Sequence, residues 1–284
     1  MERRPYGNTG ENLSIIGFGG IVVMQADPSS AARWVAEAVD RGVNYFDVAP
    51  TYGNAEERLW PALAPHRQGV FLACKTTQRL AAGVRDELHT SLARLHTDHF
   101  DLYQLHAVNT AAEMQQVTGP GGALEAVAQA REQGKIRYVG FSSHSVETAL
   151  ALLDHGGFDS VLFPVNWGLY LKADFGPQVV ARARELGVAR LALKAMAAGK
   201  LAEGAAKRWT KCWYQPLDDV DRVALALRFA LSQPITAALP PGEAELFRLA
   251  LEVAERFTPV TADEVAELRQ QAAATDPLFS LAAS

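Results

Sequence analysis

The stretch VFLACKTTQRLAAGVRDELHTSLARLHTDHFDLYQLH at residues 70–106 contains two apolar runs of strand character on either side of an amphipathic segment. The runs are Val70–Lys75 and His99–His106, and Val84–Leu95 between them repeats apolar residues near the helical spacing. Strands joined through a helix pair in parallel, because the crossover returns the chain to the edge from which it started. The stretch therefore predicts a strand–helix–strand unit in a parallel sheet.

The same alternation recurs along the rest of the chain. Further helical segments are expected at Ser30–Arg41, Ala123–Gln133 and Val220–Leu231. Together with the two runs above, eight strands are expected: Val43–Asp47, Val70–Lys75, His99–His106, Arg137–Ser142, Ser160–Asn166, Ala189–Lys194, Ile235–Leu239 and Phe257–Val260. Eight such units predict an α/β fold, the (β/α)8 TIM barrel, as a single domain over residues 1–284, since barrels of about 250 residues fold as one unit.

A doubly wound open sheet is the alternative architecture for alternating strands and helices. To hold a dinucleotide, it would need a Gly-x-Gly-x-x-Gly turn between an early strand and the helix that follows. The sequence has no such turn, because Gly17, Gly19 and Gly20 come before the first repeat. These glycines lie in Ser14–Val23, which we expect to form an N-terminal β-hairpin that closes the bottom of the barrel.

The composition argues against several classes of function. The formal net charge is −5 and lysines and arginines do not cluster, so no nucleic-acid partner is expected. The two cysteines, Cys74 and Cys212, are too few for a disulfide framework, a four-thiolate zinc site or an iron–sulfur cluster. The first residues lack the apolar core of a signal peptide and no apolar run is long enough for a bilayer, so we expect a cytoplasmic protein without a membrane partner.

Polar side chains end three early strands, at the edge where a barrel forms its active site. Asp47, Lys75 and His106 are these residues, and Tyr52 follows Asp47 in the next loop. A carbonyl that receives hydride develops charge on its oxygen and needs a proton donor there, which Tyr52 can be. Lys75 can lower the pKa of Tyr52, and Asp47 can neutralise the buried ammonium of Lys75. His106 can direct the carbonyl oxygen, so these four residues are the predicted catalytic residues of a carbonyl reduction.

The sequence around these residues resembles the aldo-keto reductase family. The similar stretches are FDVAPTYGNAEE at 46–57, SLARLHTDHFDLYQLH at 91–106 and GKIRYVGFSSH at 134–144, and the likeness begins at RPYGNTG, residues 4–10. The resemblance covers nearly the whole chain and implies that the four residues are the Asp–Tyr–Lys–His tetrad of the family. It also implies NADPH as the cofactor, with NADH as the alternative, and a small-molecule aldehyde or ketone as the substrate.

The family holds the nicotinamide carboxamide with a Ser-Asn pair after the fourth strand and a Gln in the fifth. The corresponding residues here are Ser142, Ser143 and Leu162, so two of the three depart from the family pattern. Asn166 lies on the same side of its strand as Leu162 by period-two alternation. We therefore expect Asn166 to supply the missing amide group, the alternative being a polar residue that caps the strand.

The resemblance also indicates where the phosphates of the cofactor bind. Lys194 stands after the sixth strand, where the family has a Tyr that stacks on the nicotinamide, and is expected near the pyrophosphate. After the seventh strand Gly242 replaces a family Lys, in a turn whose helix amides still favour phosphate. Arg248 keeps the family spacing for the 2′-phosphate of NADPH and Glu252 lies near the adenine-contacting position, whereas Glu243 would favour NADH.

Aromatic residues on loops expected at the barrel mouth are candidates for the substrate pocket. They are Trp167 and, in the insertion Trp209–Pro216, Trp213 and Tyr214, and packing between helices is an equally open interpretation. A second function remains open, namely an NADPH-binding barrel that senses redox state or regulates a partner with little turnover. A metal-dependent hydrolase would need several His or Asp ligands at strand ends, and the sequence offers only Asp47 and His106, so no metal is expected.

Overall fold

The computed structural model describes residues 1–204 and 206–281, and within them eight strands form one parallel sheet. The order of the strands is β12-β9-β8-β7-β6-β5-β4-β3, so strands that follow one another in the sequence also pair in space. The strands are Phe18–Gly19 (β3), Tyr45–Asp47 (β4), Phe71–Thr76 (β5), Phe100–Leu105 (β6), Ile136–Ser142 (β7), Ser160–Pro164 (β8), Ala189–Leu193 (β9) and Ala237–Leu239 (β12).

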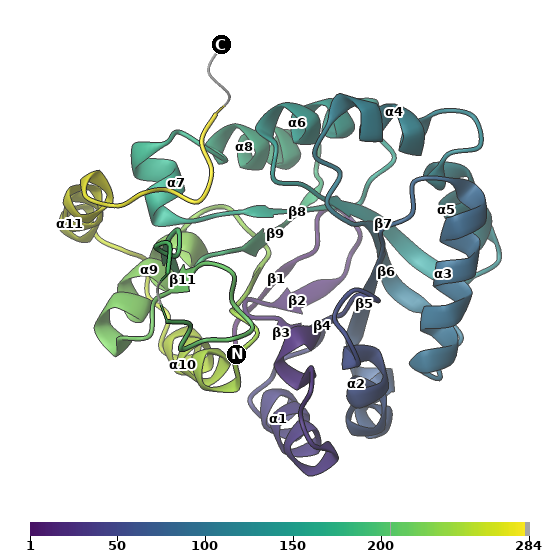
Figure 1. Ribbon diagram of the computed structural model, residues 1–284, viewed down its shortest axis with the longest axis horizontal. Helices are drawn as coiled ribbons and strands as arrows, with labels where there is room; N and C mark the ends of the chain where they lie inside the picture. The colour runs from purple at the N-terminus through teal and green to yellow at the C-terminus, as the bar shows by residue number, and fades with distance from the viewer. Residues whose placement is uncertain (205, 282–284) are drawn as a thin grey trace.

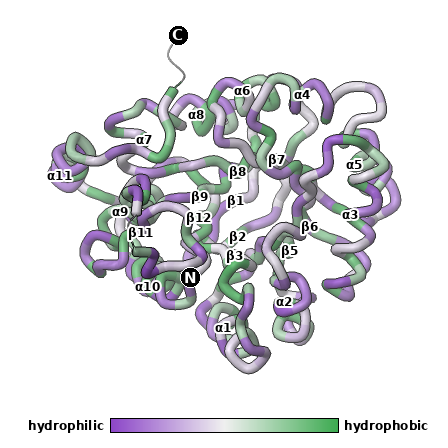
Figure 2. The backbone as a smooth tube through the Cα atoms, in the orientation of Figure 1, coloured by the Kyte–Doolittle hydropathy of each residue, from purple (hydrophilic) through white to green (hydrophobic). Residues whose placement is uncertain are grey.

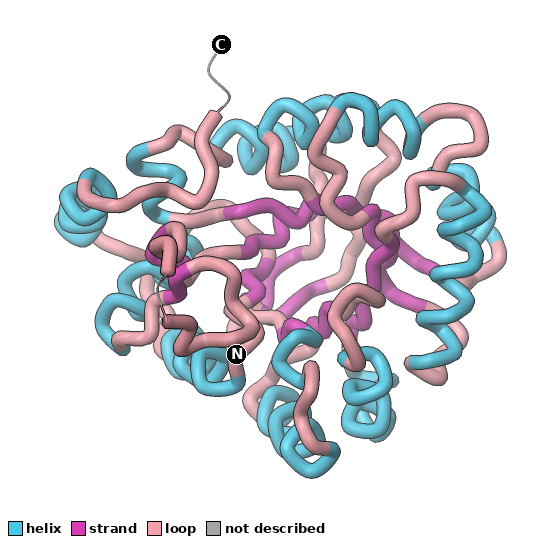
Figure 3. The backbone as a smooth tube through the Cα atoms, in the orientation of Figure 1, coloured by secondary structure: helices cyan, strands magenta, loops and turns pink. Residues whose placement is uncertain are grey.

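The two edges of this sheet meet and close it. The Ala238 N–H donates to the carbonyl of Ile15 at 2.8 Å, and the Gly17 N–H donates to the carbonyl of Ala238 at 3.0 Å. These bonds join β12 to the segment that enters β3, through a parallel bridge between Ile16 and Ala238. The predicted (β/α)8 barrel is therefore confirmed, with its helices outside the ring of strands (Figures 1 and 3).

Several of the described helices begin at a residue whose side chain accepts from a backbone N–H of the first turn. Pro28 opens the first helix after Asp27, whose side chain accepts from the Ser30 N–H. The helices are Pro28–Asp40 (α1), Ala55–Leu63 (α2), Ala81–Arg94 (α3), Ala111–Thr118 (α4), Ala123–Glu132 (α5), Val146–His155 (α6), Trp167–Lys172 (α7), Pro177–Glu185 (α8), Val220–Ser232 (α9), Ala244–Glu255 (α10) and Ala262–Ala273 (α11). Hydrophilic and hydrophobic residues alternate along these outer helices (Figure 2), as expected for helices with one buried face. None of the helices described is long and apolar enough to cross a membrane.

Side chains of each strand alternate between the barrel interior and the helical layer. On β5, for example, Phe71 and Ala73 fill the interior, whereas Leu72 and Cys74 pack outward against the helices. The same alternation continues to Lys75, which places its side chain inside the barrel at the C-terminal end of β5. The period of two therefore decides which polar side chains of a strand point into the barrel.

The structure corrects two expectations about individual strands. Phe257–Val260 is a loop between α10 and α11, where Pro259 lacks an N–H for a ladder and Phe257 packs on the guanidinium of Arg4 at 5.3 Å. The eighth strand of the barrel is instead β3. The sequence did not predict it, because two residues are too few to show an apolar–polar alternation. The predicted hairpin lies earlier than Ser14–Val23, which instead holds β3 and the 3-10 helix Gly20–Val23 (η1).

The hairpin of the structure consists of Arg3–Pro5 (β1) and Asn12–Ser14 (β2), paired antiparallel. Tyr6 and Leu13 are at most 1% exposed and belong to the cluster that fills the barrel interior. The hairpin thus closes the end of the barrel opposite the C-terminal ends of the strands. At the other end, the loop after β9 forms a small sheet of Ala197–Gly199 (β10) and Gln215–Pro216 (β11), which returns the predicted insertion to the mouth.

Candidate active site

Asp47 and Lys75 form a buried ion pair inside the barrel. Their side chains are 2% and 0% exposed, and Oδ1 of Asp47 contacts Nζ of Lys75 directly. Oδ2 of Asp47 accepts from the Tyr45 hydroxyl at 2.9 Å and from Nε2 of Gln104 at 2.9 Å. Lys75 donates also to the Val48 carbonyl at 3.2 Å. Both charges are therefore paired and hydrogen-bonded, which is the condition for burying an ion pair without a large penalty.

The ammonium of Lys75 stays charged in this environment. Burial by itself lowers the pKa of Lys75, but the negative charge of Asp47 and the neighbouring Tyr52 outweigh it and hold the pKa above its ordinary value. The Lys75 side chain is thus a fixed positive charge at neutral pH.

Tyr52 reaches this pair from the loop between β4 and α2. Nζ of Lys75 lies 5.2 Å from the centroid of the Tyr52 ring. Burial raises the pKa of Tyr52 and outweighs the opposite effect of the Lys75 charge, so the net direction is upward rather than the lowering expected from Lys75 alone. The phenol therefore keeps its proton at neutral pH and is available as a donor.

His106 follows β6 directly and faces Tyr52 edge-on, with 6.1 Å between the ring centroids. Burial, reinforced by the charge of Lys75, lowers the pKa of His106 to about 3, so the ring is neutral at physiological pH. Its Nδ1 is buried and has no hydrogen-bond partner among the described residues. Such an atom is suited to a ligand that brings its own polar group.

One cavity of about 280 Å³ at the barrel mouth brings the four predicted catalytic residues together. The cavity is also lined by five of the predicted cofactor and substrate residues, namely Ser142, Lys194, Gly242, Trp213 and Tyr214. The remaining residues that line it are Gly19, Ile21, His144, Leu162, Leu193, Lys211, Cys212, Leu239, Pro240 and Pro241. Asp47 is the single carboxylate among these lining residues, and it is neutralised by Lys75.

Lys194 is held at the wall of this cavity by two aromatic rings. Its Nζ lies 4.9 Å from the ring centroid of Trp213 and 4.6 Å from that of Tyr214. Burial lowers the pKa of Lys194 to about 8. Trp213 is 53% exposed and Tyr214 is buried, so the predicted insertion does reach the mouth, where it contacts Lys194 rather than packing between helices.

Gly242 lies where the turn after β12 passes very close to η1. A Cβ at this position would come within 2.1 Å of the Cγ2 of Ile21, which leaves no room for any side chain. The close approach gives a physical reason for a glycine where the resemblance led us to expect a lysine. Gly19, which also lines the cavity, has open space where its Cβ would stand, so the wall is hollow there.

Five of the predicted residues lie outside the cavity lining, and three of these five are buried in the protein interior. Ser143 is fully buried, and its hydroxyl donates to the Ser145 carbonyl at 3.2 Å. Asn166 is the N-cap of α7, and its amide group donates to the carbonyls of Lys194 and Ala197 at 3.1 and 2.8 Å. Trp167 is 1% exposed and packs in the core as the first residue of α7.

The predicted adenosine residues lie on α10. Arg248 pairs with Glu37 of α1, with Nη2 2.8 Å from Oε2, and its side chain is 43% exposed. Glu252 lines a separate groove between α9 and α10. Neither residue borders the mouth cavity. Either could contact a cofactor only through the part of the cofactor that extends out of the barrel.

Sequence reasoning missed several residues of this site. His144, which follows the SerSer pair, lines the cavity, and burial followed by the charge of Lys194 lowers its pKa to about 4. Lys211 lines it too and donates to the Val22 carbonyl at 2.8 Å. Gln104 precedes His106 by two residues, so period-two alternation already indicated an inward side chain. His144 and Lys211 lie in loops, and loops show no periodic pattern from which the direction of a side chain could be predicted. Within residues 1–204 and 206–281, no group of His, Cys, Asp and Glu is arranged to hold a metal ion.

Comparisons with known proteins agree with this fold. The model of the Aldo/keto reductase family matches residues 15–272, so the chain belongs to the aldo-keto reductase family, as its sequence predicted. Similar proteins from Bacillus subtilis are the uncharacterized oxidoreductase YqkF, 29% identical over 157 residues, and the aldo-keto reductase YhdN, 30% identical over 166 residues. These matches cover 50% and 52% of this chain and 49% and 48% of the relatives, so the chain spans about half the length of these relatives.

The same fold is found in an aldo-keto reductase from Bacillus halodurans in its holo form. Its TM-score is 0.76 at 23% sequence identity, and the match covers 98% of both chains. At this identity the likeness concerns the barrel alone.

Proposed function

We propose that this chain reduces an aldehyde or ketone to an alcohol with NADPH. The observation that supports the proposal is the convergence of Asp47, Lys75, Tyr52 and His106 on one cavity at the barrel mouth. A protonated phenol, a fixed ammonium beside it and a neutral imidazole are the groups that a carbonyl reduction requires. The membership of the family supports the same assignment.

Each residue has a distinct task in this mechanism. When bound, NADPH supplies the hydride. Tyr52 holds the proton that the carbonyl oxygen needs as charge develops on it. Lys75 stabilises the phenolate that remains, since its ammonium lies beside the ring. His106 donates a hydrogen bond to the carbonyl oxygen and orients it, and Asp47 keeps Lys75 charged and in place.

The residues that line the cavity fit a nicotinamide dinucleotide. The hollow wall at Gly19 leaves space for a ligand, and Nδ1 of His106, which has no hydrogen-bond partner within the described part of the chain, offers it a polar atom. Ser142 lies at the nicotinamide end, and Lys194 offers positive charge to the pyrophosphate. The first amides of α10, which begins at Ala244 two residues after Gly242, add a site that favours phosphate.

Ser143, Asn166 and Glu252 are not part of this proposal. The side chains of Ser143 and Asn166 are committed to hydrogen bonds with the protein, and Glu252 lies in the groove between α9 and α10. Trp213 and Tyr214 wall the outer side of the cavity, where an apolar part of the substrate would lie.

The test combines a binding and a turnover measurement. Fluorescence titrations with NADPH and NADH measure cofactor affinity, and a panel of aldehydes then measures consumption of the bound cofactor. We expect saturable NADPH binding and turnover with several aldehydes. Tight NADPH binding with almost no consumption across the panel would indicate a redox-sensing barrel instead, and the absence of binding would contradict the proposal altogether.

A further inference from the structure

The direction of the His106 ring depends on the backbone that carries it. Its Nδ1 has no partner among the described residues, and its nearest aromatic contact is the edge-on ring of Tyr52. The next residue, Ala107, has a φ of 53°, in the left-handed region that a residue with a Cβ rarely adopts. A conformation of this kind persists only where surrounding contacts hold it.

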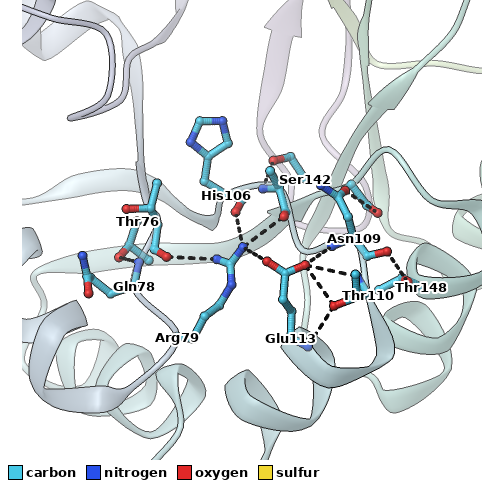
Figure 4. A network of polar contacts seen from close by, with 12 residues as sticks. Thr76, Gln78, Arg79, His106, Asn109, Thr110, Glu113, Ser142 and Thr148 are labelled. Atoms are coloured by element: carbon cyan, nitrogen blue, oxygen red, sulfur yellow. Dashed lines mark hydrogen bonds and ion pairs between the residues drawn. The ribbon is translucent and has the colours of Figure 1, made fainter. Parts of the chain in front are cut away.

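Arg79 holds this turn from the loop between β5 and α3. Its Nη2 donates to the carbonyl of His106 at 2.9 Å and to the carbonyl of Ala107 at 3.0 Å. The same nitrogen contacts Oε1 of Glu113 at 2.9 Å, so the guanidinium lies between the turn and a carboxylate (Figure 4). Arg79 stands four residues after Lys75, in the loop that follows β5. Through Arg79 this loop contacts the turn that follows β6.

Glu113 is itself fixed from the opposite side. Its Oε2 accepts from the backbone N–H groups of Asn109 at 2.8 Å and Thr110 at 3.1 Å, within a capping box at the start of α4. The Ala107 N–H donates to the hydroxyl of Ser142 at 2.8 Å. The His106–Ala107 turn is thus held at both of its carbonyls and at the amide between them.

We propose that Arg79 is a positioning residue for carbonyl reduction, which fixes the His106–Ala107 turn and thereby the direction of the imidazole that orients the carbonyl oxygen. This inference rests on the proposed function for the role of His106. A guanidinium suits the task because it is planar and donates from two nitrogens: while Nη2 holds the turn, Nη1 donates to the Thr77 carbonyl at 3.3 Å and fixes the plane of the group. A lysine keeps the charge but presents a single mobile ammonium.

The first arm of the test measures catalysis with a prochiral ketone. Arg79→Met and Arg79→Lys should lower kcat by up to about 100-fold, since small displacements of a catalytic group have effects of this size. Both variants should also lower the enantiomeric ratio of the alcohol, because a loosely held carbonyl exposes both faces. NADPH affinity should stay within about twofold, as expected for a loss confined to the chemical step. Arg182→Met is the matched control, since Arg182 pairs with Asp154 and Glu185 on the outer surface and should change none of these values.

The second arm does not depend on activity. The charged groups near the His106 ring are Lys75 and Arg79, and the titratable neutral groups are Tyr52 and His144. Burial, followed by the charge of Lys75, lowers the pKa of His106 to about 3. An NMR titration of the histidine Cε1–H signals, assigned with His106→Asn, should show no His106 transition above pH 4 in the wild type. In Arg79→Lys the charge is kept, so a transition between about pH 5 and 7 would report a ring that has moved toward solvent.

The two arms separate the possible failures. A wild-type titration of His106 in both Arg79 variants, with unchanged kcat and enantiomeric ratio, would overturn the proposal. A shifted titration in Arg79→Lys together with no carbonyl turnover in any protein would support the positioning role and contradict the proposed reductase function.

Discussion

At the scale of single residues, the Asp47 carboxylate is the acceptor that holds three buried side chains of the site. It accepts from Lys75, Tyr45 and Gln104, none of which is exposed. Removal of its charge would leave the Lys75 ammonium buried without a counter-charge. Breaking a buried pair in this way is far costlier than losing an exposed one.

We therefore predict that Asp47→Asn lowers the free energy of unfolding by about 3–5 kcal/mol as well as lowering the reduction rate. Chemical denaturation at neutral pH measures the stability. The control is Asp154→Asn, which removes an exposed partner of Arg182 and should cost about 1 kcal/mol or less. An Asp47→Asn protein as stable as the control would show that Lys75 does not depend on this carboxylate.

The convergence of the four predicted catalytic residues on one cavity could be predicted from sequence, because each of them ends or closely follows an apolar run. The residues that hold them could not. Gln104 reaches Asp47 because Lys75 and Gln104 are partners in the register of β5 and β6. That register cannot be predicted from the sequence of either strand alone. Arg79 contacts a turn 27 residues away, and no local pattern relates the two.

At the scale of elements, the Arg248–Glu37 pair joins α10 to α1 where the resemblance placed the 2′-phosphate of NADPH. An exposed ion pair contributes about 0–1 kcal/mol. A charge-assisted hydrogen bond to a phosphate contributes about 1.5–3 kcal/mol. We therefore expect the 2′-phosphate to replace Glu37 as the partner of Arg248 when NADPH binds.

From this balance we predict that Arg248→Ala weakens NADPH binding roughly 10-fold or more and leaves NADH binding nearly unchanged. Glu37→Gln should strengthen NADPH binding, because it removes the competing carboxylate. Dissociation constants for both cofactors, measured by fluorescence, decide the matter. Equal losses for NADPH and NADH in Arg248→Ala would mean that the arginine contacts another part of the cofactor.

The strands differ in how well their sequences predicted them. β5, β6 and β7 have six or seven residues, and the predicted ranges agree with the structure to within a residue or so. β3 has two residues, so alternation cannot reveal it, and its place in the barrel depends on the bonds of its neighbours. Short strands close a barrel through tertiary context rather than through their own pattern.

At the scale of the whole molecule, two buried neutral histidines couple stability to pH. Burial lowers the pKa of His106 to about 3 and that of His144 to about 4, whereas both rise to about 6.5 in the unfolded chain. Between these values the unfolded state binds more protons than the folded state. Stability is therefore fully present above pH 6.5 and is lost as the pH falls toward 4.

We predict that the free energy of unfolding falls between pH 7 and pH 4.5 by an amount that includes on the order of 2 kcal/mol from each histidine. The difference between the two pH values should shrink in the double variant His106→Gln, His144→Gln. His155→Gln, at the exposed end of α6, is the control and should leave the difference unchanged. A double variant with the full wild-type difference would refute the coupling.

The whole account depends on Tyr52 as the proton donor in this cavity. The most direct measurement is a single turnover, in which protein loaded with NADPH is mixed with a reactive aldehyde and the loss of the reduced nicotinamide is followed. Tyr52→Phe should bind NADPH like the wild type and transfer hydride about 10²- to 10⁴-fold more slowly, the usual range for a lost general acid. Hydride transfer at the wild-type rate in Tyr52→Phe would contradict the account, because the proton would then come from elsewhere.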